Sequence, residues 1–212
     1  MPKMKILITG CCGFAGVTLA KALSESVDSL SIVGLDNLSR TGSEINIKVL
    51  RHLGVNLVRG DVRKASDMDA LPDANWVIDC SANPSVLAGL GDQTSSRQLI
   101  EHNLLGTINL LEYCKVRNAG LILLSTSRVY SAKDLATLPI IQNNDQYTLD
   151  SRHLGIGISE RGISEAFPTT APISLYGASK LASEALILDY AEAFDFPAWI
   201  NRCGVLAGAG QF

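Results

Sequence analysis

Positive charge is scarce in this sequence. Its 212 residues hold 18 Lys and Arg against 21 Asp and Glu, which leaves a net charge of -3. A protein that holds a phosphate backbone needs a concentrated basic surplus. We therefore expect no nucleic-acid partner.

Long hydrophobic runs are lacking as well. No apolar run approaches the roughly 18 residues of a membrane span, and the run Ile6–Ile8 is too short for the core of a signal peptide. We therefore expect a cytoplasmic protein that has no membrane partner.

Cys-x-x-Cys pairs are also absent, and the five cysteines are odd in number. Cys11 and Cys12 are adjacent, while Cys80, Cys114 and Cys203 lie in or beside apolar stretches, as small buried hydrophobic residues do. This arrangement does not suggest a disulfide framework. We expect five reduced thiols, which agrees with a cytoplasmic location.

The sequence does have the composition of a chain with a sizeable core, because 47% of its residues are hydrophobic and 18% are charged. Apolar runs that are typical of strands covered on both faces alternate with segments of helical period. The expected strands are Lys5–Thr9, Leu30–Leu35, Asn56–Arg59, Trp76–Cys80, Leu121–Ser125 and Ala198–Arg202. The expected helices are Phe14–Ser26, Ser43–Leu53, Ser95–Val116 and Tyr176–Phe194. The alternation predicts an α/β fold with a Rossmann-type, doubly wound parallel sheet.

One segment, residues 131–174, interrupts this rhythm. It holds Asn143, Asn144 and Asp145 in succession, three glycines between 155 and 162, and two prolines at 168 and 172. A long stretch without periodicity is more often a functional loop or an insertion than core. We expect one domain over residues 1–212 with an irregular insertion at about 131–174.

A glycine-rich turn follows the first expected strand and opens the first expected helix. Gly10, Gly13 and Gly16, with Phe14 among them, would let the backbone turn tightly and approach a pyrophosphate at the helix N-terminus. The spacing is G-x-x-G-x-x-G, and the alternative is a tight strand-to-helix turn without a ligand. The sequence predicts a dinucleotide site here.

Two carboxylates follow the next strands. Asp36 ends the second expected strand, where a carboxylate can accept hydrogen bonds from both ribose hydroxyls, which favours NAD over NADP. Arg40 is the alternative, as a group that would hold a 2′-phosphate. Asp61 and Val62, after the third strand, would suit an adenine contact or simply form a strand-ending turn.

A second group of polar residues has the chemistry of hydride transfer. Tyr176 and Lys180 have the i, i+4 spacing that places a phenol and an ammonium on one helix face. A phenol with a pKa of about 10 is a poor base at neutral pH, so Lys180 and a cationic nicotinamide would have to stabilise the phenolate. Thr126 lies at the carboxyl end of the fifth strand, where it would hydrogen-bond the substrate oxygen.

Taken in order, these features resemble the NAD-dependent epimerase/dehydratase family of extended short-chain dehydrogenase/reductases over essentially all of the chain. The resemblance implies that Thr126, Tyr176 and Lys180 are catalytic. It implies that cofactor binding involves, besides Tyr176 and Lys180, residues Gly10, Gly13, Phe14, Gly16, Asp36, Asn37, Asp61, Val62, Ser81, Ala82 and Asn103. The alternative for Asn103 is a polar residue at the end of an apolar stripe.

The resemblance also implies an activity. It implies an NAD-dependent epimerase that oxidises a nucleotide-sugar carbinol to a ketone and then returns the hydride to the opposite face. Ser127 and Arg128 stand where dehydratases of the family carry Asp-Glu, which disfavours dehydration. Finer motifs, such as Gly60–Arg63 and the closing Gly210–Phe212, are similar to those of CDP-sugar 2-epimerases. The alternatives are a sugar-nucleotide dehydrogenase or reductase and a non-catalytic NAD-binding module.

Family members continue well past the sixth strand. The resemblance therefore implies that this chain lacks most of the C-terminal substrate domain, and we expect the chain alone to be inactive. It also implies a homodimer through the helices at 95–116 and 176–194.

Overall fold

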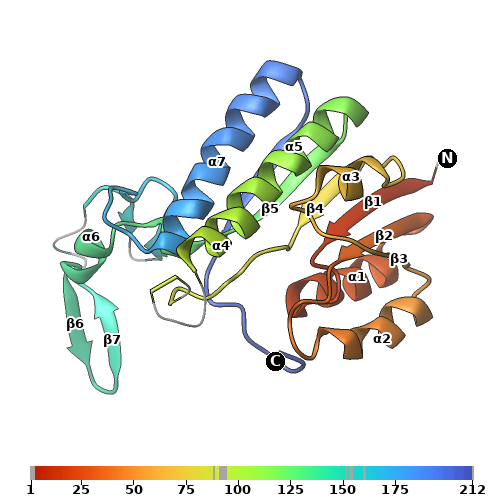
Figure 1. Cartoon of the computed structure of the whole chain (residues 1–212). Helices are drawn as coiled ribbons and strands as arrows, with labels where there is room; N and C mark the ends of the chain where they lie inside the picture. The colour runs from red at the N-terminus through yellow and green to blue at the C-terminus, as the bar shows by residue number, and fades with distance from the viewer. Residues whose placement is uncertain are drawn as a thin grey trace.

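The computed structural model describes residues 3–87, 89–90, 95–150, 152, 155–159 and 161–211. Its centre is a six-stranded sheet with the order β10-β5-β4-β1-β2-β3 (Figure 1). All five strand pairs in it are parallel. The strands are β1 (Met4–Thr9), β2 (Leu30–Asp36), β3 (Asn56–Arg59), β4 (Trp76–Asp79), β5 (Gly120–Thr126) and β10 (Ala198–Cys203).

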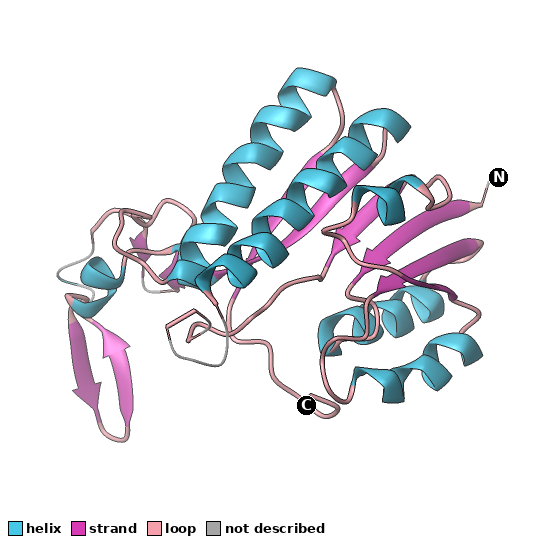
Figure 2. Ribbon diagram, in the orientation of Figure 1, coloured by secondary structure: helices cyan, strands magenta, loops and turns pink. Residues whose placement is uncertain are grey.

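Helices cover both faces of this sheet, as Figure 2 shows. On one face lie α1 (Phe14–Ser26), the 3-10 turn η1 (Ser43–Ile45) and α2 (Asn46–His52). The other face carries α3 (Ala65–Asp69), α4 (Ser96–Ile100), the π-helical turn η2 (Glu101–Leu105), α5 (Gly106–Arg117) and α7 (Leu175–Phe194). Each face has its own cluster of buried side chains, one around Leu7, Leu110 and Leu123 and the other around Ile8, Ile32 and Leu50. The predicted doubly wound fold is confirmed.

The strands could be predicted from the sequence because they bury apolar side chains on both faces of the sheet and therefore read as apolar runs. Leu7 and Ile8 of β1 are both fully buried although they point to opposite faces of the sheet. β1 pairs with β2 on one side and with β4 on the other, so the strand order reverses at β1. The carboxyl ends of β1 and β4 form the switch point at which open α/β sheets bind ligands.

The long expected helix at 95–116 is built from three pieces. Ser95 caps α4 by accepting a hydrogen bond from the Gln98 amide, and the π-helical turn η2 then joins α4 to α5. π-helical turns are rare and often lie at functional sites. Hydrophobic periodicity alone did not predict this turn, because one wide turn displaces the apolar stripe only slightly.

The segment between β5 and α7 contains short elements that the sequence analysis did not predict. They are η3 (Ser127–Val129), α6 (Ala132–Ala136) and two antiparallel pairs, β6 (Ile140–Asn143) with β7 (Gln146–Leu149) and β8 (Ile158–Ser159) with β9 (Gly162–Ile163). The β6–β7 hairpin extends away from the body of the molecule (Figure 1). Residues 151, 153, 154 and 160 of the predicted insertion lie outside the described residues.

Among the described residues, no helix combines the length and the apolar character that crossing a membrane requires.

Candidate functional site

A cavity of about 580 Å³ opens at the carboxyl ends of the sheet strands. This volume falls within the roughly 300–1,000 Å³ that small-molecule and cofactor sites occupy. The glycine-rich turn, the ends of β2, β4 and β5, the start of α7 and the chain after β10 all contribute to its wall. Predicted site residues in the wall are Gly10, Gly13, Phe14, Gly16, Asp36, Asn37, Val62, Ser81, Ala82, Thr126, Tyr176 and Lys180.

The glycine-rich turn is packed too tightly for side chains. Gly10 has a φ of +60°, and a Cβ there would lie 2.8 Å from the carbonyl oxygen of Cys80. A Cβ on Gly16 would lie 2.3 Å from the Gly10 carbonyl oxygen. Gly13 is the N-cap of α1, where no side chain caps the helix and no acidic residue occupies the first turn. The helix therefore presents uncapped N–H groups and its positive dipole end to the cavity, a combination that suits an anion.

Asp36 lies where β2 meets this turn. Its Oδ2 accepts a hydrogen bond from the Cys12 amide at 2.8 Å, and its Oδ1 accepts one from the Leu38 amide at 2.8 Å. Asn37 follows it and accepts a hydrogen bond from the Ser39 amide at 2.9 Å. Both side chains border the cavity, as the sequence predicted for a ribose site.

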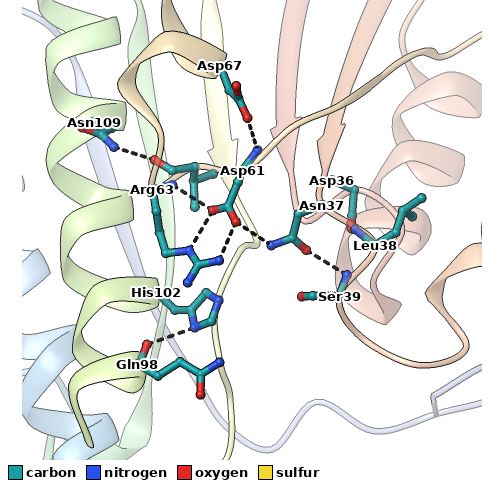
Figure 3. Close-up of polar contacts among 11 residues, drawn as sticks. Asp36, Asn37, Leu38, Ser39, Asp61, Arg63, Asp67, Gln98, His102 and Asn109 are labelled. Carbon is teal, nitrogen blue, oxygen red and sulfur yellow. Dashed lines mark hydrogen bonds and ion pairs between the residues drawn. The ribbon is translucent and has the colours of Figure 1, made fainter. Parts of the chain in front are cut away.

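The Asp61 carboxylate accepts hydrogen bonds from two neighbouring residues, Arg63 and Asn37 (Figure 3). Its carboxylate accepts hydrogen bonds from the Arg63 amide at 3.0 Å, Arg63 Nε at 2.9 Å, Arg63 Nη2 at 2.6 Å and Asn37 Nδ2 at 3.2 Å. These hydrogen bonds hold the pKa of Asp61 far below its usual value, and the bond from the Arg63 side chain has the largest effect. Val62, the next residue, forms part of the cavity wall.

Thr126, Tyr176 and Lys180 converge at the other end of the cavity. Each side chain is largely buried, and Lys180 is only 1% exposed. Burial raises the pKa of the Tyr176 phenol, while a hydrogen bond with Thr126 lowers it in part. The positive charge of Lys180 lowers the pKa of Cys80 and Cys203 against the raising effect of burial.

Asn103 joins the loop after β4 to the start of α7. Its Oδ1 accepts a hydrogen bond from the Asn83 amide at 2.8 Å, and its Nδ2 donates to Ser179 Oγ at 3.1 Å. Ser81 of the same loop donates to Asp79 Oδ1 through both its amide, at 3.0 Å, and its hydroxyl, at 2.6 Å. These contacts fix the loop that carries Ser81 and Ala82 past the cavity.

An ion pair joins a buried carboxylate of α7 to a partly buried arginine of β10. Arg202 of β10 donates to Glu184 of α7, with Nη2 at 2.8 Å from Oε2. Glu184 also accepts a hydrogen bond from Ser125, which precedes Thr126 on β5. The network connects α7, β5 and β10, and sequence reasoning missed it because charged residues are rarely so buried.

Several other cavity residues were also missed. They are His102, Pro84, Ser85 and Val86, together with Cys203 at the end of β10 and Gly204, Val205, Leu206 and Gln211 after it. A Cβ on Gly208 would lie 3.2 Å from Cζ of Phe14, so this last segment runs beside the glycine-rich turn. One feature of the sequence could have predicted His102 as a site residue, because it directly precedes Asn103, which the family resemblance had already identified.

Comparison with known protein families matches residues 6–212 to the NAD dependent epimerase/dehydratase family. The chain belongs to this family. Its membership confirms the resemblance inferred from the motifs. NAD, the predicted cofactor, is named in the family's own description.

Individual relatives carry several activities. CDP-paratose 2-epimerase of Salmonella typhi is 32% identical over 99% of this chain and 59% of its own length. dTDP-D-glucose 4,6-dehydratase of Dictyostelium discoideum is 28% identical over 98% of this chain and 45% of its own length. The solved structure of UDP-glucuronic acid 4-epimerase from Bacillus cereus in complex with NAD superposes with a TM-score of 0.70 at 26% identity, covering 98% of this chain and 59% of that one. The family member described here thus spans about half the length of these relatives.

Proposed function

We propose that this chain is the NAD-binding part of a nucleotide-sugar epimerase. The observation that carries the proposal is the convergence, in one cavity, of the glycine-rich turn, Asp36 and the group Thr126, Tyr176 and Lys180. A dinucleotide needs a ribose acceptor, an anion site and a reactive end along one path, and the cavity wall includes a candidate for each.

The wall of the cavity fits NAD chemically. The uncapped start of α1 suits the pyrophosphate, and Asp36 suits the ribose hydroxyls. Asp36 uses two of its roughly four acceptor positions on Cys12 and Leu38, which leaves capacity for two hydroxyl donors. NAD, when bound, supplies the hydride acceptor and donor of the reaction.

Side chains of this protein would then transfer the proton of the substrate hydroxyl. Tyr176 would take the proton of the substrate hydroxyl as that carbon is oxidised, and would return it when the carbon is reduced from the opposite face. Thr126 would donate a hydrogen bond to the same substrate oxygen. The Lys180 ammonium would favour the phenolate, and with the positive charge of the oxidised cofactor it would oppose the effect of burial on the Tyr176 pKa.

We propose epimerisation rather than dehydration because of Ser127 and Arg128. Both residues line the cavity directly after Thr126, and neither supplies the acid and base pair that water loss requires. The 32% identity to a CDP-paratose 2-epimerase supports a CDP-sugar as the substrate class to test first.

The test is to express the protein from its full reading frame and incubate it with NAD and a panel of UDP-, GDP-, dTDP- and CDP-sugars. We expect a product with the mass of the substrate, inverted at one carbon, and no accumulation of NADH. Stoichiometric NADH would instead identify a dehydrogenase, and loss of one water would identify a dehydratase. Binding of NAD without turnover of any sugar would identify a non-catalytic module.

We also propose a homodimer through α5 and α7. The two helices lie side by side on one face of the sheet (Figure 1) and expose Val116 and Leu188, while the turn η2 just before α5 exposes Leu105. Pairing these surfaces about a two-fold axis would bury that apolar area. Sedimentation of wild type against Leu188→Glu tests this, and an unchanged dimer in the variant would refute it.

A further inference from the structure

We propose that Arg202 is a positioning residue for the candidate catalytic lysine. By occupying the Glu184 carboxylate, Arg202 leaves the Lys180 ammonium available to Tyr176 and the cofactor. This inference rests on the proposed roles of Tyr176 and Lys180, and it adds a residue of β10 to the proposed reaction.

Three ionisable side chains follow one another along a buried stripe of α7. Tyr176, Lys180 and Glu184 are spaced four residues apart, so their side chains lie on one face of the helix. Each of the three is at most 9% exposed. Side chains of a helix lean toward its N-terminus, so Glu184 leans toward the turn that carries Lys180. Lys180 is thus flanked along the helix by a phenol and a carboxylate.

A Glu184 carboxylate without other partners would compete with Tyr176 for the Lys180 ammonium. Opposite charges at i, i+4 attract each other, and the attraction is stronger in a buried site than in water. An ammonium drawn to Glu184 would stabilise a phenolate at Tyr176 less, and burial already raises the pKa of this phenol. The stripe therefore suits proton transfer at Tyr176 when other groups hold the carboxylate.

Two neighbouring strands supply those groups. Arg202 donates to Glu184 Oε2 from Nη2 at 2.8 Å and from Nε at 3.1 Å. Glu184 Oε1 accepts the hydroxyl hydrogen of Ser125 on β5 and lies 3.3 Å from Arg202 Nε. Among the described residues, Glu184 forms its ion pair with Arg202, and Lys180 takes part in no ion pair. The carboxylate is thus held by groups other than the ammonium.

The Arg202 guanidinium is itself held in place. Its Nη1 donates to the carbonyl oxygen of Glu165 at 3.0 Å, and its Cζ lies 5.4 Å from the centre of the Tyr130 ring. The five donors of a guanidinium form a rigid fork, so one edge can bind Glu184 while another group binds Glu165. Arg202 is therefore fixed where it keeps the carboxylate occupied.

The experiment is an ultraviolet titration of Tyr176 in the protein expressed from its full reading frame, with and without NAD. Each protein is compared with a partner that also carries Tyr176→Phe, so the difference in tyrosinate absorbance belongs to this phenol. Arg202→Met should move the titration to higher pH, because the ammonium moves toward Glu184. Adding Glu184→Gln to Arg202→Met should restore the wild-type titration.

Turnover of the nucleotide sugar that wild type converts should follow the same order. At neutral pH, Arg202→Met should lower kcat per NAD-bound site about tenfold with little change in KM. The double variant with Glu184→Gln should recover to within about threefold of wild type. Arg152→Met is the matched control, because Arg152 also holds a carboxylate, Asp150, through Nε and Nη2. It should change neither the titration nor kcat.

A background without the lysine shows whether Arg202 acts through Lys180. In Lys180→Met, adding Arg202→Met should shift the Tyr176 titration much less, because no ammonium remains to be drawn away. A full shift in this background would overturn the proposal. A double variant as impaired as Arg202→Met would also overturn it, because the lost contacts with Glu165 and Tyr130 would then explain the defect.

Folding is verified by circular dichroism, since an unpaired buried carboxylate is destabilising. Should Arg202→Met not fold, Arg202→Gln replaces it, because an amide still donates to the carboxylate but carries no charge. An unchanged titration in the folded variant would overturn the proposal. Thr126, Cys203 and Asp79, which also act on the Tyr176 phenol, are the same in every protein. Failure of wild type to bind NAD would overturn the proposed function, while the titration without NAD still tests Arg202.

Discussion

Asp36 ends β2 and Asp61 lies two residues after the end of β3, and they differ in how much of each carboxylate remains available. Asp36 accepts two backbone hydrogen bonds, from Cys12 and Leu38, and borders the cavity. Asp61 accepts four and is held by Arg63. Asp36 therefore keeps more of its acceptor capacity unused than Asp61 does.

The available charge on Asp36 sets the expected cofactor preference. A 2′-phosphate would meet this carboxylate, so NAD should bind at least about tenfold more tightly than NADP, which corresponds to about 1.4 kcal/mol. Asp36→Asn should reduce that ratio, while Asp69→Asn on α3 should leave it unchanged. Calorimetry with both dinucleotides measures the ratio, and equal affinities in wild type would mean that Asp36 does not face the ribose.

Replacing Tyr176 should lower the turnover rate without changing the affinity for NAD. In the protein expressed from its full reading frame, Tyr176→Phe removes only the ionisable oxygen. Turnover should fall by a factor of about 10²–10⁴, the range of general acid–base catalysis, while NAD affinity stays nearly constant. A variant that keeps most of its turnover would contradict the assignment.

The five thiols should be unreactive in the folded protein. Burial raises the pKa of Cys11, Cys12 and Cys114 to about 12, and it raises the pKa of Cys80 and Cys203 as well. A raised pKa means that little reactive thiolate is present at pH 8. Iodoacetamide should modify the native chain far more slowly than the chain in guanidinium, as followed by intact mass. Equal rates in the two conditions would contradict this burial.

At the scale of elements, the start of α7 is the most closely fitted part of the site. Gly177 faces the turn η3, and a Cβ there would lie 2.2 Å from the carbonyl oxygen of Arg128. The contact joins the helix that carries Tyr176 to the turn that begins after Thr126. The close approach of α7 to η3 therefore depends on a residue without a side chain.

Gly177→Ala should push α7 away from η3. We expect a loss of about 1–3 kcal/mol in the free energy of unfolding, as for other overpacked sites. Turnover should fall further than that loss alone explains, because Tyr176 and Thr126 move apart. Gly155→Ala is the matched control, since among the described residues a Cβ there comes within 4 Å of Ile158 Cδ1 alone, at 3.7 Å. Equal stability of the two variants in urea would show that α7 tolerates the extra carbon.

The elements differ in how well the sequence revealed them. Helix α1 and strand β3 were predicted with the bounds observed, because their apolar spacing is regular. The β6–β7 hairpin was missed because its strands are short and its apolar residues Ile140, Ile141 and Tyr147 are exposed rather than alternating into a core. The pairing of Glu184 with Arg202 was missed because only the folded chain brings residues 18 positions apart into contact.

At the scale of the whole molecule, NAD binding should raise stability. A ligand present at 100 times its Kd and bound only to the folded state adds about 2.7 kcal/mol. For a chain of this size each kcal/mol shifts the melting temperature by roughly 2–4 °C, so residues 1–212 should melt about 5–11 °C higher with NAD. Nicotinamide mononucleotide, which lacks the adenosine half, should shift it less. A melting temperature that stays the same when NAD is added would argue against binding.

Strand β10 has a consequence for the order in which this site forms. It is the last of the six sheet strands to leave the ribosome, and it pairs with β5 at the outer edge of the sheet. Its last residue, Cys203, and the residues that follow it, Gly204–Leu206, form part of the cavity wall with Lys180. The glycine-rich turn precedes β10 by most of the sequence shown, so the two sides of the cavity are far apart along the chain. Such contacts between distant parts of the sequence form late in folding. A nascent chain should therefore acquire its full affinity for the cofactor only after β10 has docked.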